Sequence, residues 1–180
     1  MRKGGGKQKG SQFEREVCKA LSLWISNGKQ EDVFWRSAMS GGRATVARKR
    51  GKDAGSGEGD LAAVRPIGRL LLNRFVVECK FYKDLNILGL LDNEIKGGIT
   101  GFWNKLDHDS LKVGKRPFLV GKQNGMKPFV LLDYKSAVDT FGLLLQFKAY
   151  FQTADAMLIP LDVFCESAVA PKAKLKLGRK

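Results

Sequence analysis

Two charged residues in an apolar segment have the types and the spacing of a hydrolytic site. Glu78 and Lys80 lie two residues apart within the segment 75–81, which is predicted to be a strand. Side chains alternate along a strand, so both project from one face while the apolar residues around them project from the other. A charged pair in so apolar a strand is costly to bury without partners, so we expect this face to line a cleft that holds a charged species. An ion pair on a solvated edge strand is the alternative.

Asp60 supplies a second carboxylate. It precedes the apolar segment 61–64, and a hairpin between that strand and 75–81 would bring Asp60, Glu78 and Lys80 together. Carboxylate oxygens suit Mg²⁺, with Mn²⁺ as a substitute, because such an ion binds through one or two carboxylates and a substrate phosphate. The backbone carbonyl of Cys79 is a candidate further ligand, whereas its side chain is expected in the core. The metal would activate water, and Lys80 would orient that water or neutralise charge on phosphorus.

The charge of the chain indicates a polyanionic partner. Lys and Arg number 32 against 18 Asp and Glu, which gives a net charge of +14 and a pI of about 9.9. Nucleic acid is the commonest such partner, because phosphates reward each Lys or Arg through counterion release. An anionic membrane is the rival, but no stretch approaches the roughly 20 apolar residues that span a bilayer, and the N-terminus lacks an apolar signal segment. We therefore expect an intracellular, cytoplasmic protein without a membrane partner.

The cysteines and the one histidine argue against disulfide and zinc sites. Cys18, Cys79 and Cys165 are odd in number and far apart, and no CxxC pair occurs. His108 stands in a polar run that we interpret as a surface cluster, since a transition-metal site needs more ligands than the run supplies. Any metal is therefore expected to be held by oxygen.

The length of 180 residues suits one domain with basic appendages. We expect a flexible basic arm over 1–10, a single domain over 11–170 and a basic tail over 171–180. A glycine-rich basic loop spans 40–59 inside the domain. Phosphate contacts are expected from five residues of this loop: Arg43, Arg48, Lys49, Arg50 and Lys52.

Hydrophobic periodicity predicts an α/β fold. Ser11–Glu14 has the form of a capping box and opens a helix predicted over 11–26, which ends at Asn27-Gly28. Further helices are predicted over 85–106 and 134–150. Strands are predicted at 33–36, 61–64, 75–81, 118–120, 129–132 and 157–164, with a hairpin turn at Asn124-Gly125. We expect these strands to form a mixed, mostly antiparallel central sheet of about five strands, flanked by helices.

The candidate site carries a family resemblance. Asp60 in GEGDLAAV, followed by Glu78 and Lys80 in VVECK, resembles the PD-(D/E)XK nuclease signature. In that family, an Asp on a strand, a second acid and a Lys two residues later bind metal and cleave phosphodiesters. The resemblance implies a restriction-endonuclease-like core and a metal-dependent DNA endonuclease.

Two upstream segments resemble archaeal-type Holliday junction resolvases. KGSQFEREV is similar to their opening helix, and it places the helical metal-site glutamate on Glu14, acting directly or through a water. WRSA is similar to their second segment, and it maps Arg36 as a phosphate contact with Ser37 or Ser40 as a supporting residue. This implies branched DNA as substrate, a two-fold homodimer and a version encoded by a phage. The resemblance covers residues 9–83, and the segment after residue 134 has no counterpart.

Other interpretations stay open at this point. The same chemistry could act on duplex DNA, as in phage-type or restriction-type endonucleases, or the protein could be a non-catalytic basic nucleic-acid-binding protein. Glu14 could simply complete its capping box. Glu16 is interpreted as a solvated helix residue and is the fallback ligand if the register is off by two. Glu58 is more simply a solvated loop residue. Core-like spacing also places three tryptophans in the interior: Trp24, Trp35 and Trp103.

Overall fold

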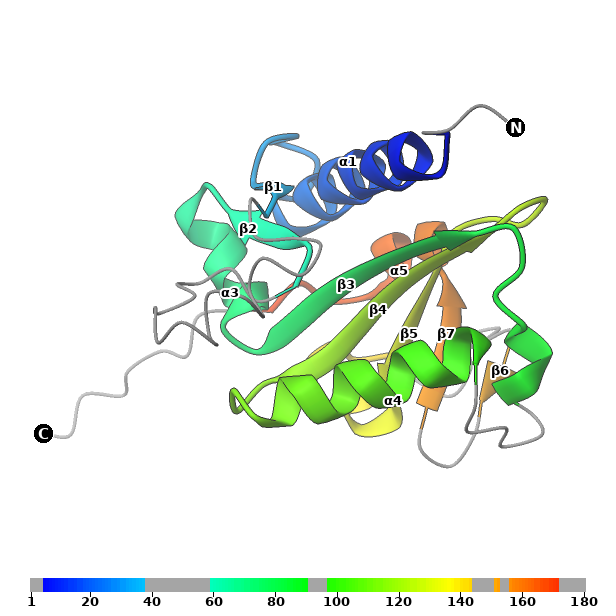
Figure 1. Ribbon diagram of the computed structural model, residues 1–180. Coiled ribbons are helices and arrows are strands. Elements are labelled where there is room, and N and C mark those ends of the chain that lie inside the picture. The colour runs from blue at the N-terminus through cyan, green and yellow to red at the C-terminus, as the bar shows by residue number, and fades with distance from the viewer. Residues whose placement is uncertain (1–4, 38–58, 91–96, 144–150, 153–155, 172–180) are drawn as a thin grey trace, which may run out of the picture.

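A mixed sheet forms the centre of the molecule, with helices on both of its faces (Figure 1). The computed structural model describes residues 5–37, 59–90, 97–143, 151–152 and 156–171. The strand order across the sheet is β3-β4-β5-β7-β6. Helices α1 (Gly5–Ile25) and α5 (Leu161–Ser167) pack on one face, and α4 (Gly98–Leu111) packs on the other.

One pairing of the central sheet is parallel and the others are antiparallel. Strand β3 (Phe75–Tyr82) runs parallel to β4 (Arg116–Gln123). Strands β4, β5 (Phe129–Asp133), β7 (Ala156–Pro160) and β6 (Phe151–Gln152) then pair in antiparallel fashion. The prediction of a mixed, mostly antiparallel sheet is therefore correct. Its extent is different, because the sheet has four full strands and a two-residue edge strand rather than about five full strands.

The first two strands form a small sheet of their own. Strand β1 (Phe34–Arg36) pairs antiparallel with β2 (Leu61–Ala63). The predicted hairpin between β2 and β3 is wrong, because the 3-10 turn η1 (Pro66–Gly68) and the short helix α3 (Arg69–Leu72) separate them. The run of leucines that begins at residue 70 is helical, and it turns the chain before β3 begins. The two sheets meet instead at Gly59, which forms a parallel bridge with Val77.

Helix α1 begins earlier than the sequence pattern predicts. It starts at Gly5, so residues 5–10 belong to the helix rather than to a separate arm. Ser11 and Glu14 consequently lie in its interior, and the interpretation of Glu14 as a capping residue is wrong. The end of the helix is as predicted: Asn27 and Gly28 adopt left-handed φ angles of 52° and 77°.

The second half of the chain departs from prediction in three places. The helix predicted over 85–106 is divided into the 3-10 turn η2 (Ile87–Leu90) and α4. The helix predicted over 134–150 is a short π-helical segment, η3 (Ser136–Thr140), and residues 144–150 lie outside the described residues. The last predicted strand stops at Pro160, where α5 begins. The hairpin between β4 and β5 is confirmed, with Gly125 at φ 77° in its turn.

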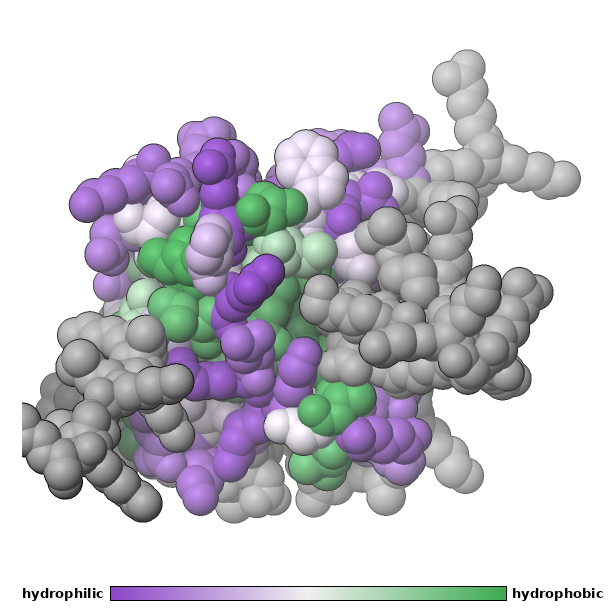
Figure 2. Space-filling model, turned by 90° about the vertical axis from the view of Figure 1, so that its left-hand side faces the viewer, coloured by the Kyte–Doolittle hydropathy of each residue, from purple (hydrophilic) through white to green (hydrophobic). Residues whose placement is uncertain are grey.

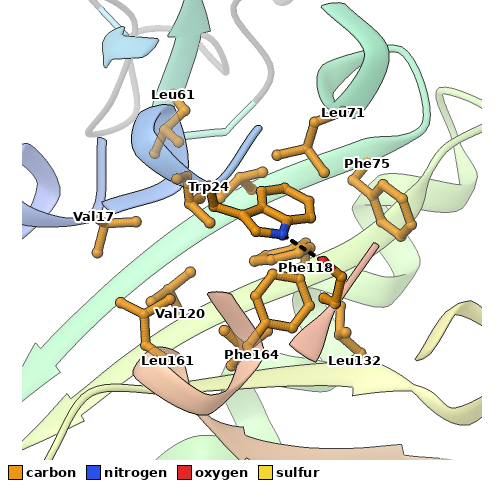
Figure 3. Close-up of a cluster of buried hydrophobic side chains, with 14 of the residues drawn as sticks. Val17, Trp24, Leu61, Leu71, Phe75, Phe118, Val120, Leu132, Leu161 and Phe164 are labelled. Atoms are coloured by element: carbon orange, nitrogen blue, oxygen red, sulfur yellow. Dashed lines mark hydrogen bonds between the residues drawn. The ribbon is translucent and has the colours of Figure 1, made fainter. Parts of the chain in front are cut away.

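Alternation along the strands divides the core in two. On the α1 face, Phe118 and Val120 of β4 pack with Trp24 of α1 and Phe164 of α5 (Figure 3). On the α4 face, Leu119 packs with the apolar side of α4 and η2. The indole Nε1 of Trp24 donates a hydrogen bond of 2.8 Å to the carbonyl of Ala168, which ties α1 to the chain beyond α5.

The surface next to β1 and β2 is mixed in character. Figure 2 faces the side on which β1, β2 and α3 lie in Figure 1, and hydrophobic side chains gather in its middle with hydrophilic ones around them. Trp35 of β1 is 62% exposed, so the prediction that all three tryptophans are internal is wrong for this one. Among the described residues, no helix is long and apolar enough to cross a membrane.

Trp24→Phe should lower the free energy of unfolding by roughly 1–3 kcal/mol, because it leaves the buried carbonyl of Ala168 without its donor. Urea unfolding followed by circular dichroism measures the change. Trp35→Phe is the matched control, and it should stay within about 0.5 kcal/mol of wild type because Trp35 is exposed. Equal effects of the two variants would contradict this account of the core.

Candidate active site

Asp60 is held against the edge strand β3 by backbone contacts. Its amide donates to the carbonyl of Val77 at 2.8 Å, and its own carbonyl accepts from the amide of Ser37 at 2.8 Å. Gly59 allows this approach, because its φ is +87° and a Cβ there would lie 2.4 Å from the Val77 carbonyl oxygen. The predicted proximity of Asp60 to β3 is therefore present, but a parallel bridge produces it and not a hairpin.

The side chain of Asp60 reaches the backbone of β3. Its Oδ2 accepts a hydrogen bond of 2.8 Å from the amide of Cys79. The amide and carbonyl of one strand residue point to the same side of the strand, so the carbonyl of Cys79 is also directed to this free edge. The Cys79 side chain is buried in the core, as predicted. The backbone carbonyl of Cys79 thus lies on the side of β3 that Asp60 occupies.

Glu78 and Lys80 share one face of β3, as their spacing predicts. The ammonium of Lys80 donates a hydrogen bond to Oε1 of Glu78, and both side chains are about a quarter exposed, at 22% and 28% respectively. The Lys80 Nζ also lies 5.4 Å from the ring centroid of Phe102, on α4. Glu78 and Lys80 therefore form a partly buried pair at the edge of the sheet, between β3 and α4.

The electrostatics of Asp60 are those of a carboxylate in a crowded anionic site. The pKa of Asp60 is raised from 3.8 to about 7, mainly by burial and in addition by the nearby charges of Glu78 and Glu14. The Cys79 amide and the charge of Lys80 oppose this rise. Burial also disfavours the charged form of Lys80, but the charge and hydrogen bond of Glu78 hold the pKa of Lys80 above its usual 10.5. The lysine therefore stays protonated, and one carboxylate of the site is poised to bind a cation.

The two neighbouring cysteines are not reactive groups. Burial raises the pKa of the Cys18 thiol to about 12, with the charge of Glu14 adding to the rise. Burial likewise raises the pKa of the Cys79 thiol well above 9.0. Since the thiolate is the nucleophilic and metal-binding form, both side chains act as small apolar residues here.

Glu14 and Arg36 meet on the other face of β3. The Arg36 Nε of β1 donates to Glu14 Oε2 of α1 at 2.5 Å, and the two side chains are 27% and 16% exposed. The charge of Glu14 raises the pKa of Asp60, so Glu14 belongs to the electrostatic neighbourhood of the site. Arg36, expected as a phosphate contact, already uses one of its five N–H donors on Glu14.

The other predicted contacts are placed only in part. Ser37 is buried, and its amide hydrogen bond to Asp60 gives it a structural position beside the site. Glu16, the fallback ligand, is half-exposed and faces Lys122 at 3.8 Å rather than Asp60. The remaining predicted DNA contacts lie outside the described residues: Ser40, Arg43, Arg48, Lys49, Arg50 and Lys52. Glu58 lies outside them as well.

The donor set fits a hard divalent cation that takes part of its coordination from water and substrate. In the described part of the chain, no three His, Cys, Asp or Glu side chains are gathered into a ready-made metal cluster. Asp60 and Glu78 nevertheless supply two interacting carboxylates, and the Cys79 carbonyl points to the same edge. Mg²⁺ binds through one or two carboxylates plus phosphate oxygens and keeps several waters, so such a set is sufficient.

Comparison with known proteins shows the family to which the chain belongs. Residues 5–154 match the family described as "Phage putative PDDEXK endonuclease", a span that includes Glu14, Arg36, Asp60, Glu78 and Lys80. The chain belongs to this family. No curated protein and no solved structure matches it. Membership of the PDDEXK endonuclease family confirms the superfamily that the motif indicates, while the resemblance to archaeal resolvases stays a prediction.

Two residues of this PDDEXK chain were not singled out by sequence reasoning. Gly59 allows Asp60 to approach β3 closely. The sequence feature that could have indicated this role is a glycine directly before the Asp of the motif. Lys122 of β4 lies near the rings of Phe13 and Phe81. The sequence feature that could have indicated it is a lysine that follows the apolar residues of β4. The parallel pairing of β3 and β4, which places Lys122 opposite Phe81, could not be read from local patterns.

Gly59→Ala should abolish cleavage and destabilise the protein by well over the roughly 1–2 kcal/mol expected for a left-handed non-glycine residue alone. The added Cβ would meet the Val77 carbonyl and displace Asp60. Gly125→Ala is the control, since Gly125 has φ +77° but open space around it. Thermal unfolding and a cleavage assay of both variants measure the difference. An active, equally stable Gly59→Ala would refute this role of the bridge.

Asp60→Asn should stabilise the metal-free protein at pH 8, by on the order of 1–2 kcal/mol or roughly 2–8 °C in Tm. The folded-state pKa of Asp60 is raised, so its stabilising effect is complete below about 3.8 and is lost as the pH rises through about 7. The advantage of the variant should therefore grow between pH 5 and pH 8. Asp139→Asn, at an exposed site on η3, should show no such trend. Thermal scans in EDTA across this range test the sign.

Proposed function

We propose that this protein is a Mg²⁺-dependent endodeoxyribonuclease that hydrolyses phosphodiester bonds at the site formed by Asp60, Glu78 and Lys80. The observation that carries the proposal is the buried Asp60 carboxylate, held at the free edge of β3 beside Glu78, with a pKa raised to about 7. A buried anion next to a second carboxylate is unfavourable unless a cation joins them. Membership of a PDDEXK endonuclease family supports the same chemistry.

Each residue of the site would have a role that follows from its position. Asp60, Glu78 and the Cys79 carbonyl would hold the ion, and Glu14 would hold it directly or through a water. When bound, Mg²⁺ or Mn²⁺ acidifies an attacking water and withdraws charge from the scissile phosphate. Lys80, protonated and next to Glu78, would orient that water or stabilise the charge that develops on phosphorus.

Arg36 and Ser37 would position the cleaved strand. The hydrogen bond to Glu14 fixes the Arg36 guanidinium, and its remaining N–H donors suit the oxygens of a phosphate. Ser37 would act as the supporting residue, or Ser40 in its place. By the pattern of the superfamily, hydrolysis would leave a 5′-phosphate.

DNA with a four-way junction is the substrate we propose, acted on by a two-fold homodimer. Support comes from the order of Glu14, Arg36, Asp60, Glu78 and Lys80 along the chain, which resembles archaeal-type junction resolvases. A net charge of +14 suits the dense phosphates of a junction. Linear duplex DNA is the alternative substrate for the same site. A symmetric cut of two strands requires two active sites related by two-fold symmetry, hence the homodimer.

Cleavage of a labelled four-way junction and of a matched linear duplex tests this function. The purified wild-type protein should cut the junction with Mg²⁺ or Mn²⁺ and not with EDTA. Asp60→Asn, Glu78→Gln and Lys80→Met should each lower the single-turnover rate by at least ~100-fold, because each removes a group that acts on the transition state. Binding measured in EDTA should change far less.

Glu166→Gln, on α5, is the matched carboxylate control and should cleave like wild type. Equal cleavage of the junction and the duplex would contradict the resolvase function and would indicate a general endonuclease. Cleavage that survives in EDTA or in Asp60→Asn would contradict the metal site. Tight binding without cleavage under any condition would instead favour a non-catalytic DNA-binding protein.

A further inference from the structure

Two lysines from different parts of the chain converge on one aromatic ring. The Nζ of Lys9, on α1, lies 5.6 Å from the ring centroid of Phe81. The Nζ of Lys122, on β4, lies 5.2 Å from the same centroid and 5.9 Å from that of Phe13. The two rings are themselves in contact, with centroids 5.6 Å apart. We call Lys9, Lys122, Phe13 and Phe81 the lysine cluster.

The lysine cluster continues the candidate active site along α1 and β3. Phe81 follows Cys79 on the same face of β3, about 7 Å further on at the rise of a strand. Lys9 precedes Glu14 by five residues, about 7.5 Å along α1. Both displacements run along the contact between α1 and β3. Since one DNA strand carries a phosphate about every 3.4 Å of helix axis, this distance corresponds to about two nucleotides of a DNA whose helix axis runs along the contact between α1 and β3.

The positive charge of the cluster is incompletely neutralised. Within the described residues, the carboxylate that faces Lys122 is Glu16, at 3.8 Å, which is longer than a hydrogen bond. No carboxylate among those residues is paired with the exposed Lys9. An aromatic ring attracts an ammonium but accepts few of its three N–H donors. Two ammonium groups on one ring repel each other, and a shared anion would relieve that repulsion.

We propose that Lys9 and Lys122, held on Phe81, bind a backbone phosphate of the DNA strand about two nucleotides from the scissile bond. This inference rests on the proposed function, because it takes DNA as the substrate of the neighbouring site. Glu16 would weaken this binding, because its carboxylate competes with the phosphate for the ammonium of Lys122. The DNA phosphate therefore has to displace the Glu16 carboxylate from the ammonium of Lys122.

A purely structural role makes different predictions. The stem of Lys122 covers the rings of Phe13 and Phe81, and this packing alone could join α1 to the sheet. Methionine keeps such a stem and removes the charge, whereas arginine keeps the charge. Lys122→Met and Lys122→Arg therefore separate packing from phosphate binding.

DNA affinity as a function of salt tests the proposal in EDTA, where no cleavage is expected. Fluorescence anisotropy with a labelled junction and duplex should show that Lys122→Met and Lys9→Met each bind several-fold to tenfold more weakly. Each should also reduce the slope of log K against log salt, by up to about 0.9, the value for the loss of the one phosphate contact that the two lysines share. Lys122→Arg should bind like wild type. Glu16→Gln should bind more tightly, by a few-fold, which a structural role would not produce.

Lys112→Met is the control for net charge. Lys112 caps α4 and pairs with Asp109 at 3.3 Å, near the end of β4 that lies opposite Phe75 and away from Phe81. It should change neither the affinity nor the slope beyond a small general effect. Wild-type affinity and slope in Lys122→Met, or weaker binding by Glu16→Gln, would overturn the proposal. Failure of the wild-type protein to bind or cleave DNA would instead overturn the proposed function.

Discussion

The close approach of Gly59 to Val77 is the constraint on which the candidate site depends. It joins the small β1–β2 sheet to the edge of the central sheet through a single parallel bridge. The next residue along is Asp60, whose amide and side chain both bond to the backbone of β3. Glycine is required twice over, for a φ of +87° and for the space that a Cβ would take. The position of the Asp60 carboxylate therefore depends on the absence of a side chain at residue 59.

The site places unfavourable charge where the fold could otherwise be apolar. Asp60 is 7% exposed and lies in the field of Glu78 and Glu14. Such a group weakens the metal-free protein at neutral pH, because the unfolded chain hydrates the carboxylate better. The surrounding core provides the compensation: an array of phenylalanines packs on the α1 face of the sheet, and Trp24 ties α1 to the chain after α5. An unfavourable buried charge of this kind is expected where function, rather than stability, has selected the residues.

Local patterns predicted the strand that carries Glu78 and Lys80 better than they predicted the topology. The alternation of Glu78 and Lys80 required only that residues 75–82 form a strand, and they do. The partner of β2 could not be predicted, because the segment between β2 and β3 forms the η1 turn and α3, and β2 pairs with β1 instead. Glu14 resembled a helix cap until the start of α1 at Gly5 placed it mid-helix. In the first case, a long-range strand pairing took the place of the local one that the pattern predicted.

The distribution of ion pairs singles out one carboxylate. Around the site, Glu14 is paired with Arg36, Glu78 with Lys80 and Glu16 with Lys122. Among the described residues, Asp60 has no such cation and is held instead by the backbone amide of Cys79. A chain with 32 basic residues could easily have supplied one more. Each neighbouring acid has its base and the most buried one does not, which supports the proposal that a divalent ion supplies the missing positive charge. A fixed lysine or arginine at this place would compete with such an ion for the carboxylate.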